Sequence, residues 1–127
     1  MFREYIQRLL KELSLQDGAS LPQELNSFSL DIDGISVTLF DRAPGVDYTA
    51  TLGMLLDENM EQTLTTILRG NFLGQATRKA YLGLDEAGQR VVVNMSIPVI
   101  RSFREFQDML EDFSNVISFW KAEIPLQ

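Results

Sequence analysis

The segment FSLDIDGISVTLF, residues 28–40, constrains the fold more than any other stretch of the 127-residue chain. Apolar and polar residues alternate on both sides of Asp33-Gly34, a dipeptide that is typical of a two-residue β-hairpin turn. The apolar positions are Phe28, Leu30 and Ile32 in the first arm and Ile35, Val37 and Leu39 in the second. The chain is therefore expected to build its core on an antiparallel sheet with one apolar face.

The spacing of apolar residues predicts the other elements. Helical spacing indicates an amphipathic helix over the first 13 residues, a second helix that opens with a capping box at Asn59, and a long third helix after a capping box at Ser102. Three further strands are predicted at 48–58, 79–84 and 89–95. Residues 41–47, DRAPGVD, are predicted to be a loop, and Gly70-Asn71 is predicted to end the second helix.

This order of elements predicts an α+β fold. We expect a twisted antiparallel sheet of about five strands with three helices, in the order α-β-β-β-α-β-β-α. A chain of 127 residues is long enough for one hydrophobic core and short for two. The expectation is therefore a single domain over residues 1–127.

Composition narrows the classes of partner. With 18 acidic and 11 basic residues the net charge is −7, which disfavours binding to nucleic acid or to an anionic membrane. No apolar run approaches the roughly 18–20 residues of a membrane span. The charged N-terminal segment does not resemble a signal peptide, and cysteine is absent. These features together indicate a cytoplasmic protein.

The sequence offers few groups for catalysis. Histidine and cysteine are both absent, so the commonest general base, metal ligand and thiol nucleophile are missing. Neither a Walker A loop nor a G-x-G-x-x-G motif occurs. Asp31-x-Asp33-Gly34 resembles the start of a calcium loop but is better interpreted as the hairpin turn. We therefore expect a binding protein with no cofactor and no metal; an enzyme that relies on carboxylates alone is a third option.

Two helices carry apolar stripes that a partner could cover. The stripe of the first helix spans an arc of roughly 140°, wider than contact with one sheet requires. Ile6, Leu9 and Leu13 are expected to face the core and Phe2 and Leu10 to lie at the margins, the alternative being that the whole stripe is buried. The stripe of the second helix faces either its own sheet or a second copy, and the sheet edges invite strand addition.

Residues 67–93, ILRGNFLGQATRKAYLGLDEAGQRVVV, resemble the signature region of the CesT/SycE-like (class I) type III secretion chaperones. In that region a helix ends in a Leu-x-x-Asn-x-Leu-Gly pattern and is followed by Ala-x-Leu-Gly-Leu-Asp, a glycine turn and a valine-rich strand. The matching positions are Leu68, Asn71, Leu73, Gly74, Ala80, Leu82, Gly83, Leu84, Asp85, Gly88, Val91 and Val93.

The resemblance implies a bacterial cytoplasmic chaperone of virulence-related secretion that binds the N-terminal segment of one or more effectors in extended form without ATP. It implies a homodimer, or a heterodimer with a related chaperone. The implied effector contacts are Phe2, Ile6, Leu10, Ile32, Val37 and Leu39, and the implied dimer contacts are Met60, Leu64, Ile67, Leu68 and Val92. The alternative is a regulatory protein of the same fold that acts on transcription or secretion control through protein contacts.

Overall fold

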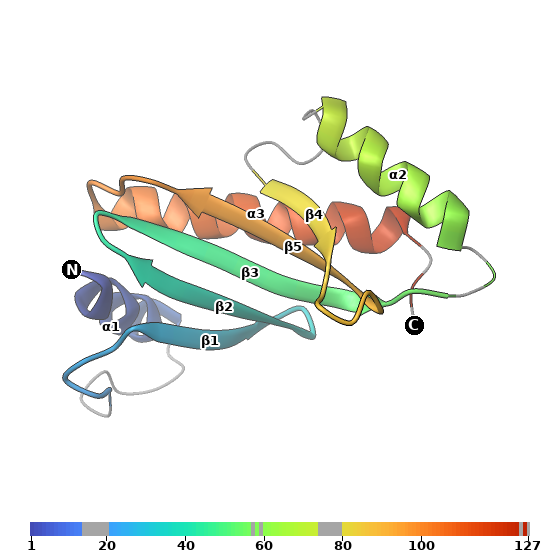
Figure 1. Cartoon of the computed structure of the whole chain (residues 1–127). Helices are drawn as coiled ribbons and strands as arrows, with labels where there is room; N and C mark the ends of the chain where they lie inside the picture. Colours follow the sequence, from blue (N-terminus) through green and yellow to red (C-terminus); the bar gives the residue numbers. More distant parts are fainter. Residues whose placement is uncertain (14–20, 57, 59, 74–79, 125, 127) are drawn as a thin grey trace.

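A computed structural model describes residues 1–13, 21–56, 58, 60–73, 80–124 and 126, and it confirms the predicted α+β order (Figure 1). Along the chain the elements are α1 (Phe2–Leu13), β1 (Ser27–Ile32), β2 (Ile35–Arg42), β3 (Gly45–Met54), α2 (Met60–Leu73), β4 (Ala80–Leu84), β5 (Arg90–Ile97) and α3 (Phe103–Glu123). The five strands belong to one sheet, as the alternating patterns predict.

The strands lie in the order β1-β2-β3-β5-β4, and every neighbouring pair is antiparallel. Ala50 of β3 pairs with Val37 of β2 on one side and with Val93 of β5 on the other, so β3 and its neighbours form the middle of the sheet. β1 and β4 are the two edge strands. Each therefore has one backbone edge without a neighbouring strand of the sheet.

The first hairpin has the turn that its sequence predicts. Asp33 and Gly34 have φ angles of 52° and 81°, and two consecutive positive values are typical of a type I′ turn. The Asp31 carboxylate accepts a hydrogen bond of 2.8 Å from the backbone N–H of Gly34. Ile32 and Ile35 pair next to the turn, which fixes the register of both arms.

Three boundary predictions are wrong. The third strand, predicted to reach residue 58, ends at Met54, where its pairing with β5 ends. Residues 41–47 are almost entirely strand, because β2 continues to Arg42 and β3 begins at Gly45, which pair with each other. A two-residue turn is enough to reverse the chain there, although Pro44 and Gly45 are typical loop residues. α2 also continues through Gly70 and on to Leu73; a glycine inside a helix costs only about 1 kcal/mol. The predicted cap Asn59 and the predicted strand start Lys79 lie outside the described residues.

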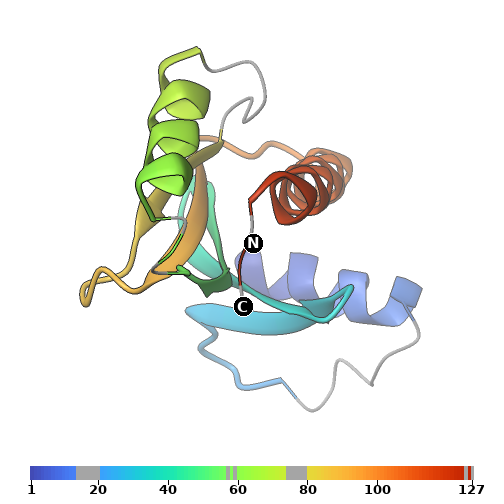
Figure 2. The same cartoon turned by 90° about the vertical axis from the view of Figure 1, so that its right-hand side faces the viewer.

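Helices cover the two faces of the sheet differently. α1 and α3 lie against one face, whereas α2 lies on the other side beside β4 (Figure 2). α3 begins as predicted after Ser102, whose hydroxyl oxygen accepts a hydrogen bond of 3.1 Å from the Glu105 N–H. We call the face under α1 and α3 the inner face and the opposite one the outer face.

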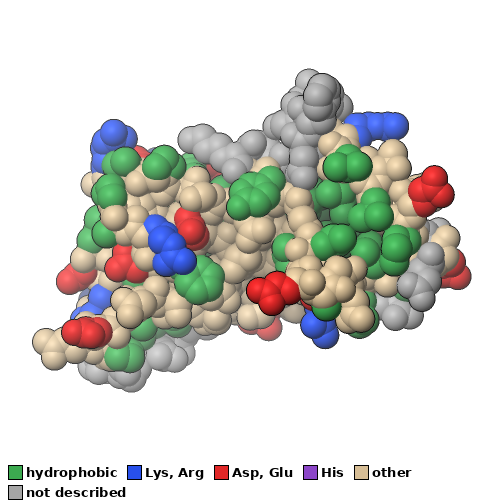
Figure 3. Space-filling model, viewed as in Figure 1, with side chains coloured by type: hydrophobic (Ala, Val, Ile, Leu, Met, Phe, Trp, Pro, Cys, Tyr) green, Lys and Arg blue, Asp and Glu red, His purple; other side chains and the backbone are tan. Residues whose placement is uncertain are grey.

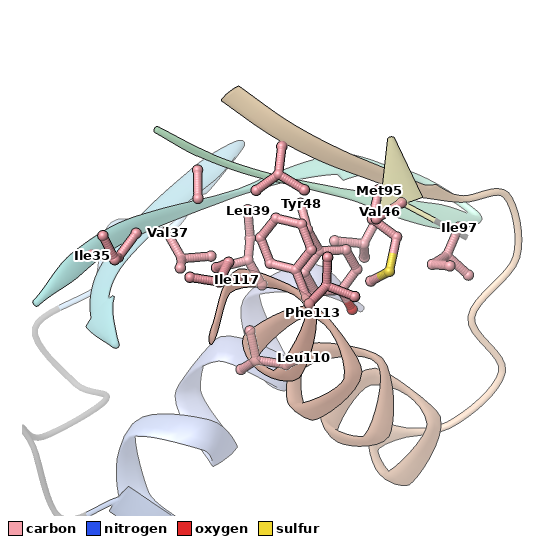
Figure 4. Packing of buried hydrophobic residues seen from close by; sticks show 14 of the residues in the cluster. Ile35, Val37, Leu39, Val46, Tyr48, Met95, Ile97, Leu110, Phe113 and Ile117 are labelled. Atoms are coloured by element: carbon pink, nitrogen blue, oxygen red, sulfur yellow. The ribbon is translucent and has the colours of Figure 1, made fainter. Parts of the chain in front are cut away.

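The core fills the space between the inner face and α3 (Figure 4). Tyr48 of β3 is fully buried, and its ring centroid lies 5.8 Å from that of Phe113 and 6.3 Å from that of Phe106. The Tyr48 hydroxyl donates a hydrogen bond of 3.3 Å to the Phe106 carbonyl oxygen. Burial raises the pKa of this phenol well above its ordinary value, so Tyr48 stays protonated.

The apolar stripe of α1 is buried more completely than the sequence predicts. Phe2 and Leu10 are both 2% exposed, so the expectation that they lie at the margins is wrong. The reason is that α1 is enclosed from two sides: by the sheet, and by α3, where the Tyr5 ring packs at a tilt against Phe106 with ring centroids 5.3 Å apart. Leu13, expected in the core, is 47% exposed because it is the last residue of the helix.

Candidate protein-binding surfaces

Among the described residues, no group of three or more carboxylates lies close enough to hold a metal ion. The pKa of Asp85 is lowered, first by hydrogen bonds from the backbone N–H groups of Gln89 and Arg90. These bonds, of 2.9 and 3.2 Å, hold the β4–β5 turn together. They give the carboxylate a structural role.

Five of the six residues expected to contact an effector are buried in the core. These are Phe2, Ile6, Leu10, Val37 and Leu39, each at most 2% exposed. Three of them belong to α1 and two to β2, and the packing of α1 and α3 on the inner face covers all five, so the single chain does not present them as surface contacts. Ile32 of β1 is the exception, since it is only partly buried. The spacing of apolar residues cannot distinguish a covered strand or helix from one at the edge of the fold.

β1 provides a partly open apolar surface at one edge of the sheet. Phe28, Leu30 and Ile32 point to the inner face and are packed against the core without being fully buried. In a two-residue hairpin the pair next to the turn exchanges both of its hydrogen bonds, so the N–H groups of Ser29 and Asp31 point away from β2. We call Phe28, Leu30, Ile32 and this unpaired backbone the β1 edge.

α2 provides a second apolar surface, on the outer side of the sheet. Its stripe is split: Thr63 and Ile67 are buried, while Met60 and Leu68 are exposed, Leu68 by 70%, and Leu64 is half-buried. Ile67 is thus not available as a surface contact in the single chain. It lies on the side of α2 turned toward the sheet, where α2 packs on β4.

The exposed side of α2 continues onto the sheet. Met54 and Leu56 line a hollow of about 550 Å³ together with Met60, and Val92 of β5 lies on the same outer side. Figure 3 shows hydrophobic side chains gathered beneath α2. We call Met54, Leu56, Met60, Leu64, Leu68 and Val92 the α2 face.

Sequence reasoning missed Met54 and Leu56. Simple alternation placed Met54 on the same face as Tyr48, Ala50 and Leu52. The register of β3 against β5 shifts between Thr51 and Gly53, and this bulge turns Met54 to the outer side opposite Arg90. The glycine was the one local signal, because an isolated glycine in a strand pattern often marks a bulge.

The middle of the outer sheet face differs from both surfaces. Thr49 and Asn94 are joined by a side-chain hydrogen bond of 2.7 Å, and Ser96 donates one of 2.6 Å to Asp47. Asp47 also pairs with Arg42, with an N–O distance of 3.3 Å. These polar groups satisfy one another across β2, β3 and β5. Two apolar surfaces available to a protein partner are therefore the β1 edge and the α2 face. Outside them Tyr81, Leu84, Val99 and Phe119 are further exposed apolar side chains.

Comparisons with known proteins agree with this fold. A model of the Tir chaperone protein (CesT) family matches residues 8–121. No curated protein sequence matches this chain. None of the helices in the described part of the chain has the length and apolar character needed to span a membrane.

Several solved structures resemble the chain. The ExsC–ExsE complex has a chain with a TM-score of 0.71 at 17% identity, covering 98% of this chain and 93% of the other. The HopA1–SchA chaperone–effector complex has one with a TM-score of 0.71 at 16% identity, covering 95% and 93%. The heterodimeric ExoU–SpcU complex from the type III secretion system of Pseudomonas aeruginosa gives 0.68 at 16% identity, covering 94% and 97%. At these identities the likeness concerns the fold.

Proposed function

The chain belongs to the Tir chaperone protein (CesT) family, and from this premise we propose that it is a type III secretion chaperone. It binds the N-terminal chaperone-binding segment of one or more effector proteins in extended form. Binding keeps that segment soluble and competent for secretion, and it uses no ATP. Similar folds occur in a chaperone–effector complex and in a complex of a type III secretion system, which supports the proposal.

The observation that carries this proposal is the β1 edge. An extended segment can add to the sheet beside β1 because the N–H groups of Ser29 and Asp31 have no strand of the sheet to bond. Alternate side chains of the segment would then cover the exposed parts of Phe28, Leu30 and Ile32. Of the contacts expected from sequence, we retain Ile32 and add the other two.

A segment that is disordered before binding needs more than one strand's length of contact. Ordering it costs several kcal/mol, so such complexes bury about 1,000–3,000 Å². Exposed Leu13 at the end of α1 offers further apolar surface. We propose that the effector segment runs along the β1 edge and continues over apolar surface outside the sheet.

The α2 face serves a different contact in this proposal. Here the chain forms a dimer, with Met60, Leu64, Leu68 and Val92 as contacts and Ile67 supporting α2 from beneath. The α2 face lies beside β4, at the opposite edge of the sheet from β1. A partner on one surface therefore leaves the other surface free.

The remaining properties follow from the same assignment. We propose that the protein acts in the bacterial cytoplasm as a binding protein and not as an enzyme, and that it needs no cofactor. Its net charge of −7 keeps the free chain soluble while apolar side chains such as Leu68 are exposed.

The test uses proline to block the β1 edge. Tagged wild-type chain, Ser29→Pro and Ser29→Ala are each used to capture proteins from the native cytoplasm, and limited proteolysis then maps the protected segment. Ser29→Pro removes one outward N–H and places a ring where the added strand would lie, so we expect effector affinity to fall about tenfold or more. Ser29→Ala controls for the lost hydrogen bond to Thr38.

The supporting result is a secreted protein that is protected at its N-terminal segment by wild-type chain and Ser29→Ala and is released by Ser29→Pro. Capture of a folded regulatory protein without a protected segment would favour the regulatory alternative. Equal retention by all three forms would show that the effector does not pair with β1.

A further inference from the structure

α2 carries only two charged side chains in its 14 residues, and they lie near opposite ends. Glu61 is in the first turn and Arg69 follows eight positions later. Both side chains are exposed, and neither forms an ion pair with another residue that the structure describes. Both flank the exposed apolar stripe on the solvent side, away from buried Thr63 and Ile67.

The stripe and the charges share nearly the same centre. Met60, Leu64 and Leu68 follow one another at intervals of four, so Leu64 is the midpoint of the stripe. The midpoint between Glu61 and Arg69 is one position further along, a difference of about 1.5 Å along the helix axis. This arrangement is nearly symmetric in position but opposite in charge.

A second copy of α2 packed antiparallel about Leu64 would match this pattern. Met60 would then lie against the partner subunit's Leu68, and Leu64 against the partner subunit's Leu64. A two-fold axis places equivalent flanks on the same side, so Glu61 would lie beside the partner subunit's Arg69. The symmetry produces this ion pair twice, once at each end of the stripe.

We infer that Glu61 and Arg69 are partner-selecting residues, which favour a second copy of this chain over a related chain. The inference rests on the proposed dimer contact through the α2 face. It adds that these two charged residues determine which chain is accepted as the partner. The apolar stripe alone accepts any complementary apolar helix. A related helix with another charge order would instead place like charges together or leave both charges unpaired, and such repulsive elements produce specificity.

Helix electrostatics give a competing reason for the same two residues. An acidic residue in the first turn and a basic residue nearer the C-terminal end both interact favourably with the helix dipole and so stabilise the helix. That role changes helix stability in each chain separately and creates no preference between partners. A test must therefore read partner choice and not stability alone.

The test exchanges the charges in two variants, Glu61→Arg and Arg69→Glu, and in the double variant that carries both changes. Each single variant places like charges at both ends of its own homodimer, so we expect its dimer dissociation constant to rise about tenfold or more. The double variant restores opposite charges and is expected to dimerise within about threefold of wild type. Sedimentation measures the constants, and circular dichroism checks the fold.

The decisive arm mixes the two single variants, one of them carrying a mass tag. In the mixed dimer both ion pairs are restored, because one chain supplies two arginines and the other two glutamates. Native mass spectrometry should find that heterodimers make up about nine-tenths of the dimers or more, against about half for random pairing. Raising the salt concentration should reduce this preference, since exposed charges are screened.

Three outcomes would overturn the inference. Random pairing in the mixture, with single variants that dimerise like wild type, rejects the ion pairs and leaves the α2 dimer standing. Random pairing with weakened dimers and lowered helicity assigns both residues to helix stability. A wild-type chain that is monomeric at micromolar concentration rejects both the dimer and the role of its selecting residues. Effector capture at the β1 edge is tested by a separate experiment, so that proposal can stand when this one fails.

Discussion

Single side chains hold the turns that set the sheet register. In the β4–β5 turn the Asp85 carboxylate accepts hydrogen bonds from the Gln89 and Arg90 N–H groups, and the Asp85 carbonyl oxygen accepts one of 2.9 Å from Gly88 N–H. These bonds favour the ionised form, so the pKa of Asp85 is lower in the folded chain than its ordinary value of 3.8. The turn positions β4 beside β5 and so determines which strand forms that edge.

Asp85→Asn should therefore lower stability in a pH-dependent way. The stabilisation from the ionised carboxylate is fully present above the ordinary pKa of 3.8 and is lost as pH falls through the lowered value. Urea unfolding should show wild type more stable than the variant at pH 7, with the difference shrinking below about pH 4. Glu86→Gln is the charge-matched control. A difference that stays constant from pH 7 to pH 3 would contradict the assignment.

At the scale of elements, α3 organises the inner face. Its 21 residues run under the sheet, and its buried side chains meet those of β2, β3 and α1. Tyr5 of α1 and Tyr48 of β3 both contact Phe106, with ring centroids 5.3 and 6.3 Å away. One helix thus joins the first helix to the middle of the sheet, and its N-terminal end is set by the Ser102 cap.

Ser102→Ala should reduce the free energy of unfolding by about 1 kcal/mol, because the Glu105 N–H loses its hydrogen-bond acceptor. Ser118→Ala is a matched control, since Ser118 is exposed within the same helix and alanine has the higher helix propensity there. Chemical denaturation of both variants measures the effect. Equal stability of Ser102→Ala and Ser118→Ala would show that the cap contributes nothing.

At the scale of the whole molecule, the two apolar surfaces lie at opposite edges of one sheet. The β1 edge begins the strand order and β4, with α2 beside it, ends the order. The side chains of the β1 edge point to the inner face and the α2 face lies on the outer side, where the polar network of Thr49, Asn94, Asp47 and Ser96 occupies the middle of the sheet. This separation is why we assign the surfaces to two different partners that can be bound together.

Leu68→Asp should give a monomer that keeps its fold, because Leu68 is 70% exposed in the single chain and would face a second copy. Ile67→Asp should instead cost several kcal/mol of stability, because Ile67 is 5% exposed and an unpaired carboxylate would be buried. Light scattering reports the mass and circular dichroism the fold. A folded Leu68→Asp dimer would refute the placement of the interface.

The sequence by itself determined the kinds of element and their order. Alternation around Asp33-Gly34 predicted the hairpin, and the Ser102 capping box predicted where α3 begins. Both predictions are correct because the period of apolar residues and helix capping depend on residues close together in the chain. The resemblance of residues 67–93 to one chaperone family agrees with the family match over residues 8–121.

Only the tertiary structure decided which apolar residues are covered. Ile32 and Val37 belong to the same alternating apolar pattern. Val37 is buried because β2 lies inside the sheet, whereas Ile32 is partly exposed because β1 is an edge strand. Ile67 and Leu68 are adjacent in one stripe, and the packing of α2 on β4 buries the first and exposes the second. Exposure depends on strand order and helix placement, which arise from contacts between residues far apart in the chain.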